Sequence, residues 1–257
     1  MPNRDLAERL IAARRASHQI SDLPTDLVPT SVAAGYDVAA AVERDLSWEP
    51  LGWKIAGTTA EVRQKLKINE PIYGRTYKRF QVASPCQFRH ADLLDPLVEC
   101  EFFVTLGKDL APRDDAWTAE EVTNAVGEVH AGIEVAECRF SKKSLPPLSA
   151  ILADGAASGR YVYGDPVANW RDGLTDVAVV LEIEGVPRRH GTGRDVYGDP
   201  LAPLHWLAET LRNRGLGLSA GEMISTGSCT GMLPVRPGQT ILARFGDHAR
   251  IEIAFTD

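Results

Sequence analysis

The chain has 257 residues, of which 44% are hydrophobic and 25% charged, and its formal net charge is −7. This composition is typical of a folded globular protein, and the negative charge argues against nucleic acid and favours cations or small molecules as ligands. No apolar run approaches the roughly 18–20 residues of a membrane span, and residues 1–19 lack a signal-peptide core, so we predict no membrane partner. The four cysteines show no C-x-x-C spacing, which favours reduced thiols and a cytoplasmic location.

The apolar pattern divides the chain into a helical beginning and a strand-rich remainder. Helical spacing and capping residues predict helices over residues 3–15, 31–46, 58–66, 118–129 and 203–214. Capping boxes are predicted at residues 58–61 and 118–121. Extended segments are predicted over residues 48–55, 97–107, 131–135, 177–184, 222–225, 241–245 and 251–255, the last two as a hairpin. Residues 70–90 have the pattern of a loop. We therefore predict an α+β protein, with a helical part over residues 1–50 and one continuous mixed-β unit over residues 51–257.

Two carboxylates share one face of the predicted strand 97–107. Side chains alternate along a strand, so Glu99 and Glu101 point to one side and their apolar neighbours point to the other. Two like charges on a half-buried face are unfavourable unless a positive charge lies between them. A metal ion is the simplest such charge. The alternative is that the pair forms the solvated face of an edge strand.

A third carboxylate, Glu134, interrupts the apolar strand pattern of residues 131–135. Three carboxylates with no His or Cys beside them select a hard cation, so we predict that Glu99, Glu101 and Glu134 bind Mg²⁺, or Mn²⁺, rather than Zn²⁺. Three side-chain oxygens leave coordination positions open for a bidentate substrate and water.

Lys54 is the second unusual residue, because it lies in an uncharged run between Trp53 and Ile55, shortly before a predicted helix. Burial lowers the pKa of a lysine and lets it move protons near neutrality, unless a nearby carboxylate counteracts the effect. The alternative is a surface lysine whose ammonium reaches the solvent. The chain has no G-x-S-x-G, P-loop or dinucleotide motif, so the chemistries that depend on those motifs lose support.

Four segments resemble, in their order along the chain, one known family. They are Gly52–Thr59, Glu99–Glu101 with Gly107 close behind, Ile133–Val135 and Ala153–Gly159. Together they resemble the 2-keto-4-pentenoate hydratase / 4-oxalocrotonate decarboxylase branch of the fumarylacetoacetate hydrolase (FAH) superfamily. The likeness extends from about residue 4 to the C-terminal hairpin, and includes the loop 225–231. The ordered combination is specific to the superfamily, whereas no single segment is.

The resemblance implies a mixed β-sandwich/roll body of the FAH C-terminal-like type with N-terminal helices. It also implies a divalent metal, usually Mg²⁺, and a homo-oligomer, commonly built from dimers. By their positions in the motifs, Glu99, Glu101 and Glu134 would be the metal ligands and Lys54 an active-site acid/base.

The chain departs from this family pattern at two places. Hydratases of the branch tend to carry an aspartate where this chain has Tyr77–Phe80, and to read A-D-N-A-S-S-G where it has Ala153–Gly159. In the family these positions help to place substrate or water. The basic residues around position 79 favour a different or more anionic substrate. We predict Arg79, Asp154, Ser158 and Thr230 as substrate-binding residues, Arg79 because it belongs to this basic group.

The expected function is that of a metal-dependent lyase acting on a 2-oxo or 2-hydroxydienoic acid in aromatic or related catabolism. The substrate would chelate the Mg²⁺, Lys54 would move the proton for ketonisation, and water would add to a 2-hydroxypenta-2,4-dienoate to give a 4-hydroxy-2-oxo acid. The rivals are a decarboxylase of a 4-oxalocrotonate-type acid, a C–C hydrolase of a fumarylpyruvate- or acylpyruvate-type diketo acid, and an inactive subunit that partners an active paralogue. The lack of an H-x-x-E pair disfavours hydrolysis, and retention of Lys54 and the glutamates disfavours the inactive subunit.

Overall fold

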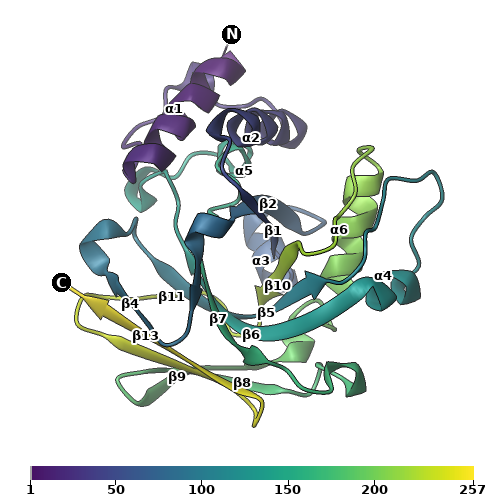
Figure 1. Cartoon of the computed structure of the whole chain (residues 1–257). Coiled ribbons are helices and arrows are strands. Elements are labelled where there is room, and N and C mark those ends of the chain that lie inside the picture. The colour runs from purple at the N-terminus through teal and green to yellow at the C-terminus, as the bar shows by residue number, and fades with distance from the viewer. Residues whose placement is uncertain (1) are drawn as a thin grey trace.

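Three helices pack together on one side of the molecule. In the computed structural model, which describes residues 2–257, these are α1 (Pro2–Ala16), α2 (Val32–Leu46) and α5 (Leu148–Ala153), and Figure 1 shows them beyond one end of the curved strands. Ser31 caps α2, since its hydroxyl accepts a hydrogen bond from the Ala34 N–H at 3.1 Å. The apolar stripes of α1 and α2 meet, burying residues such as Leu6, Leu10 and Val38 in a small core.

The larger sheet has eight strands and curls strongly (Figure 1). Its order is β2-β1-β10-β5-β6-β7-β3, and β11 also pairs with β5. The strands are β1 (Pro50–Ala56), β2 (Ile72–Tyr77), β3 (Gln81–Ala83), β5 (Leu97–Leu106), β6 (Val126–Ala136), β7 (Arg160–Pro166), β10 (Met223–Ser228) and β11 (Leu233–Pro234). β5 therefore lies inside the sheet, and the edge-strand alternative for Glu99 and Glu101 is excluded.

The smaller sheet has five strands in the order β4-β13-β12-β8-β9. They are β4 (Cys86–Arg89), β8 (Ala178–Ile183), β9 (Val186–Thr192), β12 (Thr240–Phe245) and β13 (Ala249–Thr256). The main core includes residues of both sheets: Val98, Cys100, Phe102 and Val104 of β5 belong to it with Phe245 of β12. The rings of Phe102 and Phe245 meet edge to face at 5.3 Å. The alternation predicted for this strand is confirmed, because its apolar face enters the core.

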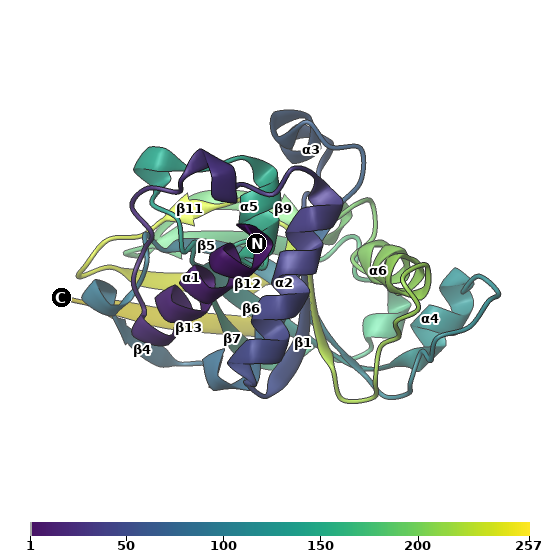
Figure 2. The ribbon, with the colours of Figure 1, turned by 90° about the horizontal axis from the view of Figure 1, so that it is seen from above.

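Three more helices and several short 3₁₀ turns complete the chain, and Figure 2 shows α4 and α6 together at one end. None of the helices described is long and apolar enough to span a bilayer. The helices are α3 (Ala60–Leu66), α4 (Ala119–Ala125) and α6 (Ala202–Arg212). The 3₁₀ turns are η1 (Thr25–Leu27), η2 (Lys78–Phe80), η3 (His90–Asp92), η4 (Lys142–Ser144), η5 (Trp170–Asp172) and η6 (Gly193–Asp195).

The predictions for residues 70–90 and 118–129 are wrong in part. Residues 70–90 are not a loop, because they carry β2, β3 and β4. Gly74 is there for packing rather than for a turn: a Cβ on it would lie only 2.0 Å from the Gly155 carbonyl oxygen. The helix predicted over 118–129 ends at Ala125, since the chain then enters β6 and pairs with β5. Tertiary pairing overrides the local helical pattern there.

The prediction of an α+β protein is otherwise confirmed. N-terminal helices, a curled mixed sheet and a second sheet build the body, and the closing hairpin of β12 and β13 forms with the expected strands. The division of the chain at residue 50 stays a prediction: β1 begins at Pro50, and an isolated bridge between Ile20 and Phe140 joins the N-terminal part to the body.

Candidate active site

Three glutamates from two neighbouring strands converge on the face of the larger sheet opposite the main core. Glu99 of β5 pairs directly with Glu134 of β6, and Glu101 lies two residues further along β5 (strands in Figure 1). One carboxylate oxygen of each glutamate lies within 4.8 Å of the others. The strand register therefore produces the three-carboxylate cluster that the sequence predicts.

All three carboxylates are buried, with relative exposures of 6%, 1% and 0% for Glu99, Glu101 and Glu134. Desolvation raises the pKa of Glu99 to about 7, although Lys54 lowers it. Desolvation also raises the pKa of Glu101 well above its usual value, and the negative charges of Glu134 and Glu99 add to the effect. Three buried like charges favour a cation between them.

Two residues of strand β10 donate hydrogen bonds to the Glu101 carboxylate. The Ser225 hydroxyl donates a hydrogen bond to Glu101 Oε2, and the Gly227 N–H donates to the same oxygen at 3.0 Å. The pairing of β10 with β5 shifts between Ser225 and Ser228, and Gly227 there adopts a φ of +107°. A residue with a side chain would be strained in that conformation, so the glycine lets the backbone turn its N–H towards the carboxylate.

Lys54 is buried in the site, with 1% of its surface exposed, so the alternative of a surface lysine is excluded. Its ammonium lies 3.2 Å from Glu134 Oε2 and donates to the Ala156 carbonyl oxygen, also at 3.2 Å. Burial by itself lowers the pKa of Lys54, but the three carboxylates outweigh it and the net pKa is raised. The lysine is therefore held as an ammonium beside Glu134.

Tyr161 of β7 is a site residue that the sequence did not reveal. Its hydroxyl donates to Glu134 Oε1 at 3.2 Å and lies 3.0 Å from the Ser158 hydroxyl. Ser158 thus reaches the carboxylates through Tyr161. Tyr161 lies opposite Glu134 in the pairing of β6 with β7. Only this strand register identifies Tyr161 as a site residue, and a single sequence does not give it.

The other sequence-predicted residues lie in different surroundings. Asp154 is fully buried, and its carboxylate pairs with Arg139 at 2.7 Å and with Arg14 at 3.3 Å. Arg79 is exposed on η2 and stacks 4.2 Å above the Trp48 ring. Thr230 accepts a hydrogen bond from the N–H of Cys100, the residue between Glu99 and Glu101, at 3.3 Å. Among residues 2–257, neither Asp154 nor Arg79 forms an ion pair with Lys54. Their substrate-binding roles stay predictions.

An apolar wall lies beside the carboxylates. Phe103 follows Glu101 by two residues in β5 and packs with Leu51, Met223 and Tyr161 in a buried cluster. Phe103 also lies over Gly132 of β6, where a Cβ would meet the ring at 2.2 Å. This apolar cluster reaches the carboxylates through Tyr161, whose hydroxyl donates to Glu134.

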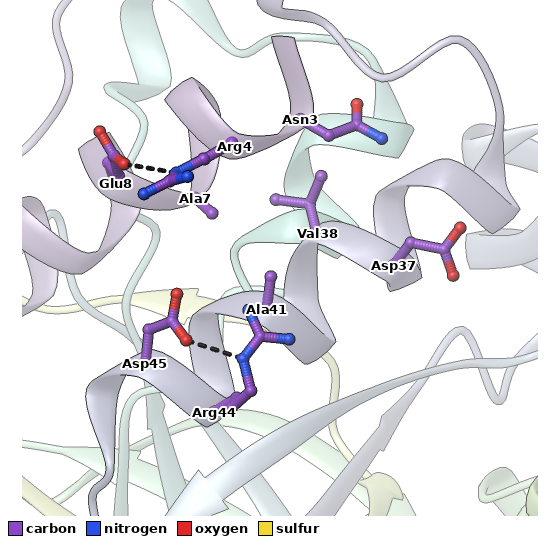
Figure 3. Close-up of a pocket in the computed structure, with 9 residues that line it drawn as sticks. All are labelled: Asn3, Arg4, Ala7, Glu8, Asp37, Val38, Ala41, Arg44 and Asp45. Carbon is purple, nitrogen blue, oxygen red and sulfur yellow. Dashed lines mark hydrogen bonds and ion pairs between the residues drawn. The ribbon is translucent and has the colours of Figure 1, made fainter. Parts of the chain in front are cut away.

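A separate surface groove lies between α1 and α2, away from the glutamates. Figure 3 shows an apolar floor that includes Val38, with the ion pairs Arg4–Glu8 and Arg44–Asp45 at its rim. Its volume is about 460 Å³, and none of its lining residues belongs to the carboxylate cluster.

The chain belongs to the fumarylacetoacetate (FAA) hydrolase C-terminal family, which it matches over residues 63–256. Within that family it falls in the hydratase/decarboxylase branch. It is 29% identical over 238 residues to the 2-keto-4-pentenoate hydratase of Paraburkholderia xenovorans, covering 91% of this chain and 87% of the relative. It is 30% identical over 247 residues to the 4-oxalocrotonate decarboxylase of Pseudomonas sp. strain CF600, covering 93% and 91%.

A solved structure shows the same fold. The 4-oxalocrotonate decarboxylase from Pseudomonas putida G7, complexed with magnesium and adipate, superposes with a TM-score of 0.88 at 27% identity, over 98% of this chain and 96% of the other. The predicted fold and family are thereby confirmed. The chain is an enzyme of the hydratase/decarboxylase group, and the two activities are represented by relatives of similar identity.

The residues of the site fit a divalent cation. The donor set consists of carboxylate oxygens alone, which suits Mg²⁺ or Mn²⁺. Glu134 Oε2 is buried and accepts no hydrogen bond from residues 2–257, although Lys54 lies nearby as an ion-pair partner. This oxygen therefore has free capacity to bind a metal ion.

Proposed function

We propose that this chain is a Mg²⁺-dependent hydratase of a 2-hydroxypenta-2,4-dienoate-type substrate, forming a 4-hydroxy-2-oxo acid. The observation that supports this most directly is the buried cluster of three glutamates with Lys54, which an apolar cluster containing Phe103 adjoins through Tyr161. The first cluster suits the acid end of such a substrate, and the second suits its hydrocarbon end.

Glu99, Glu101 and Glu134 would hold the metal, with Mn²⁺ as a substitute for Mg²⁺. When bound, such a cation polarises a carbonyl and stabilises negative charge that develops on an adjacent oxygen. Tyr161 and Ser225 hold the carboxylates Glu134 and Glu101 in place by hydrogen bonds.

Lys54 would transfer protons. Ketonisation moves the proton of the 2-hydroxyl to C5 and leaves the C3–C4 double bond conjugated to the new carbonyl. Water then adds its hydroxyl to C4 and a proton to C3. The Lys54 ammonium, fixed between Glu134 and the Ala156 carbonyl, is the buried group placed to donate and take back a proton.

The charges around the site favour an uncharged substrate tail over a second carboxylate. Arg75 pairs with Glu43 at 2.7 Å and with Glu222 at 2.6 Å, so its charge is neutralised. Lys78 is exposed and pairs with Glu49. Of the basic residues that favoured a more anionic substrate in the sequence, Arg75 and Lys78 therefore have acidic partners, and Arg79 is exposed over the Trp48 ring. The wall formed by Phe103, Leu51 and Met223 suits a vinyl or methyl group.

Decarboxylation of a 4-oxalocrotonate-type acid is the second candidate. It is favoured by the similarity of the whole chain to the Pseudomonas putida G7 decarboxylase. Its substrate carries a second carboxylate, for which the site would need a cation from elsewhere. Hydrolysis of a diketo acid is less well supported because the chain lacks an H-x-x-E pair to activate water. An inactive subunit is less well supported because Lys54 and the three glutamates converge.

The experiment that tests the proposal follows product formation by NMR. Purified protein with Mg²⁺ is incubated with 2-hydroxypenta-2,4-dienoate, 4-oxalocrotonate and fumarylpyruvate, and Glu101→Gln is the matched control. We expect conversion of the dienoate to 4-hydroxy-2-oxopentanoate, and none by the variant. Release of CO₂ from 4-oxalocrotonate with no hydration would favour the second candidate, and turnover by the variant equal to that of the parent would refute a role for the carboxylates.

Assembly and location complete the proposal. We propose a homo-oligomer working in the cytoplasm on a small-molecule substrate, with Ser158 and Thr230 beside the bound substrate. Light scattering of the purified protein tests the oligomer, and a monomer would contradict it.

A further inference from the structure

The turn after α5 has an unusual backbone and lies directly against Lys54. Three consecutive residues, Gly155, Ala156 and Ala157, have positive φ angles of +70°, +55° and +60°. Alanine adopts this left-handed conformation only against steric resistance, so two such alanines in a row need surroundings that enforce the turn. The carbonyl in the middle of the turn, that of Ala156, accepts the hydrogen bond from Lys54.

Asp154, at the start of the turn, is fixed by two buried arginines. Arg139 donates from its backbone N–H to Oδ2 at 2.9 Å and from Nε to Oδ1 at 2.7 Å. Arg14 lies 3.3 Å from Oδ1 and also donates to the main-chain carbonyl of Asp154. The aspartate is therefore held at its side chain and its backbone at once. Charge-assisted bonds of this kind restrict geometry strongly in a buried setting.

Arg14 reaches this position from α1, at the other end of the sequence. Its side chain is 3% exposed, although it carries a full charge. The Arg14 guanidinium has space there because residue 155 is a glycine: a Cβ on Gly155 would lie 3.1 Å from a terminal nitrogen of Arg14. One of the two departures from the family pattern thus lies in contact with Arg14.

We infer that Arg14 is a positioning residue for Lys54: through Asp154 it fixes the 154–157 turn, whose Ala156 carbonyl orients the lysine ammonium. The turn has further support from β2, since Gly74 packs against the Gly155 carbonyl, and from the Glu137 N–H, which donates to the Ala157 carbonyl at 3.0 Å. Asp154 then acts by anchoring backbone. The catalytic part of this inference rests on the role proposed above for Lys54.

The test measures how well Lys54 is protected, without any substrate. Acetic anhydride labels lysines in the purified protein, and mass spectrometry compares Lys54 with the exposed Lys65, whose side chain is 71% accessible. We expect Arg14→Gln to increase relative labelling of Lys54 roughly tenfold, because the turn opens locally. Arg15→Gln, on the exposed side of the same helix, should leave it unchanged.

General loss of stability must be separated from the local effect. Ile241→Val in the second sheet removes one buried methylene and serves as a destabilised control. Labelling of Lys54 that increases no more in Arg14→Gln than in this control would overturn the inference. If Arg14→Gln does not fold, Arg14→Lys decides, because a lysine can pair with the carboxylate but lacks the planar fork that also reaches the carbonyl. We expect Arg14→Lys to increase the labelling of Lys54, but less than Arg14→Gln would. Failure of Arg14→Lys to fold would also overturn the inference.

Activity gives an independent readout once a substrate is found. We expect Arg14→Gln to lower kcat by roughly tenfold or more while KM stays within about twofold, since a misplaced proton donor affects the reaction more than binding. An unchanged kcat with increased labelling would contradict the catalytic part alone. Lack of turnover by the parent protein would refute the proposed function and leave the labelling result intact.

Discussion

At the scale of the residue, the site pairs buried charges that would be unfavourable alone. Lys54 lies against Glu134, and Asp154 lies between two arginines. Removing one member of such a pair leaves an uncompensated buried charge. If Lys54 is removed, a bound metal ion can still compensate the charge of the glutamates. If Arg14 or Arg139 is removed, no such ion compensates Asp154.

Lys54→Met should therefore separate metal binding from turnover. We expect the variant to bind Mg²⁺, since the three glutamates remain, and to lose roughly 10²- to 10⁴-fold in kcat, the usual contribution of a general acid or base. Calorimetry gives the affinity and steady-state kinetics give kcat at saturating Mg²⁺. Retention of parental kcat would show that another group transfers the proton.

At the scale of the element, local capping and long-range pairing contribute separately to stability. Thr118 closes a capping box on α4: its hydroxyl accepts from the Glu121 N–H at 3.2 Å, and the Glu121 carboxylate accepts from the Thr118 N–H at 2.8 Å. The sequence predicted this box, and it is confirmed. A second box was predicted at Thr58, but Thr59 is the residue that caps α3, accepting from the Val62 N–H at 3.2 Å.

Thr118→Ala should weaken α4 without affecting the site. Loss of the cap costs about 1 kcal/mol of unfolding free energy, and a protein of this size then melts roughly 2–4 °C lower. Differential scanning calorimetry measures the shift, and Thr118→Ser, which keeps the hydroxyl, is the control. A change in Mg²⁺ affinity would show that α4 is coupled to the carboxylates.

At the scale of the whole molecule, the carboxylate cluster links stability to pH and to metal. Folding raises the pKa of Glu99 from 4.5 to about 7 through desolvation. A group with a raised folded-state pKa stabilises the fold below its unfolded pKa, and this stability is lost as the pH rises through the folded value. Glu101 and Glu134 shift in the same direction.

Protein in EDTA should therefore melt at a lower temperature at pH 8 than at pH 5, by roughly 5 °C. Saturating Mg²⁺ should raise Tm more at pH 8 than at pH 5, because ligand carboxylates must be deprotonated to bind it. Thermal melts across this range test the expectation, with Glu99→Gln as a control whose dependence is weaker. A Tm in EDTA that rises from pH 5 to 8 would contradict it.

The larger sheet shows how far sequence reasoning reaches. The sequence alternation of β5 predicted that Glu99 and Glu101 share one face, since a strand's period of two is a local property. The loop predicted over residues 70–90 is wrong, although Pro71, Gly74 and Pro85 there are residue types typical of turns. Pro71 instead precedes β2, and Gly74 serves a contact with residue 155, a distant part of the sequence.

The sequence by itself determined the faces of the strands, the helix caps and the types of residue that can bind a hard cation, because these depend on neighbours along the chain. The tertiary structure alone decided that Tyr161 meets Glu134, that Arg14 and Arg139 hold Asp154, and that Arg75 is neutralised by Glu43 and Glu222. Those contacts depend on strand register and on helix α1 packing against the body. No local pattern in a single sequence shows which distant side chain will form an ion pair or hydrogen bond with a buried charged group.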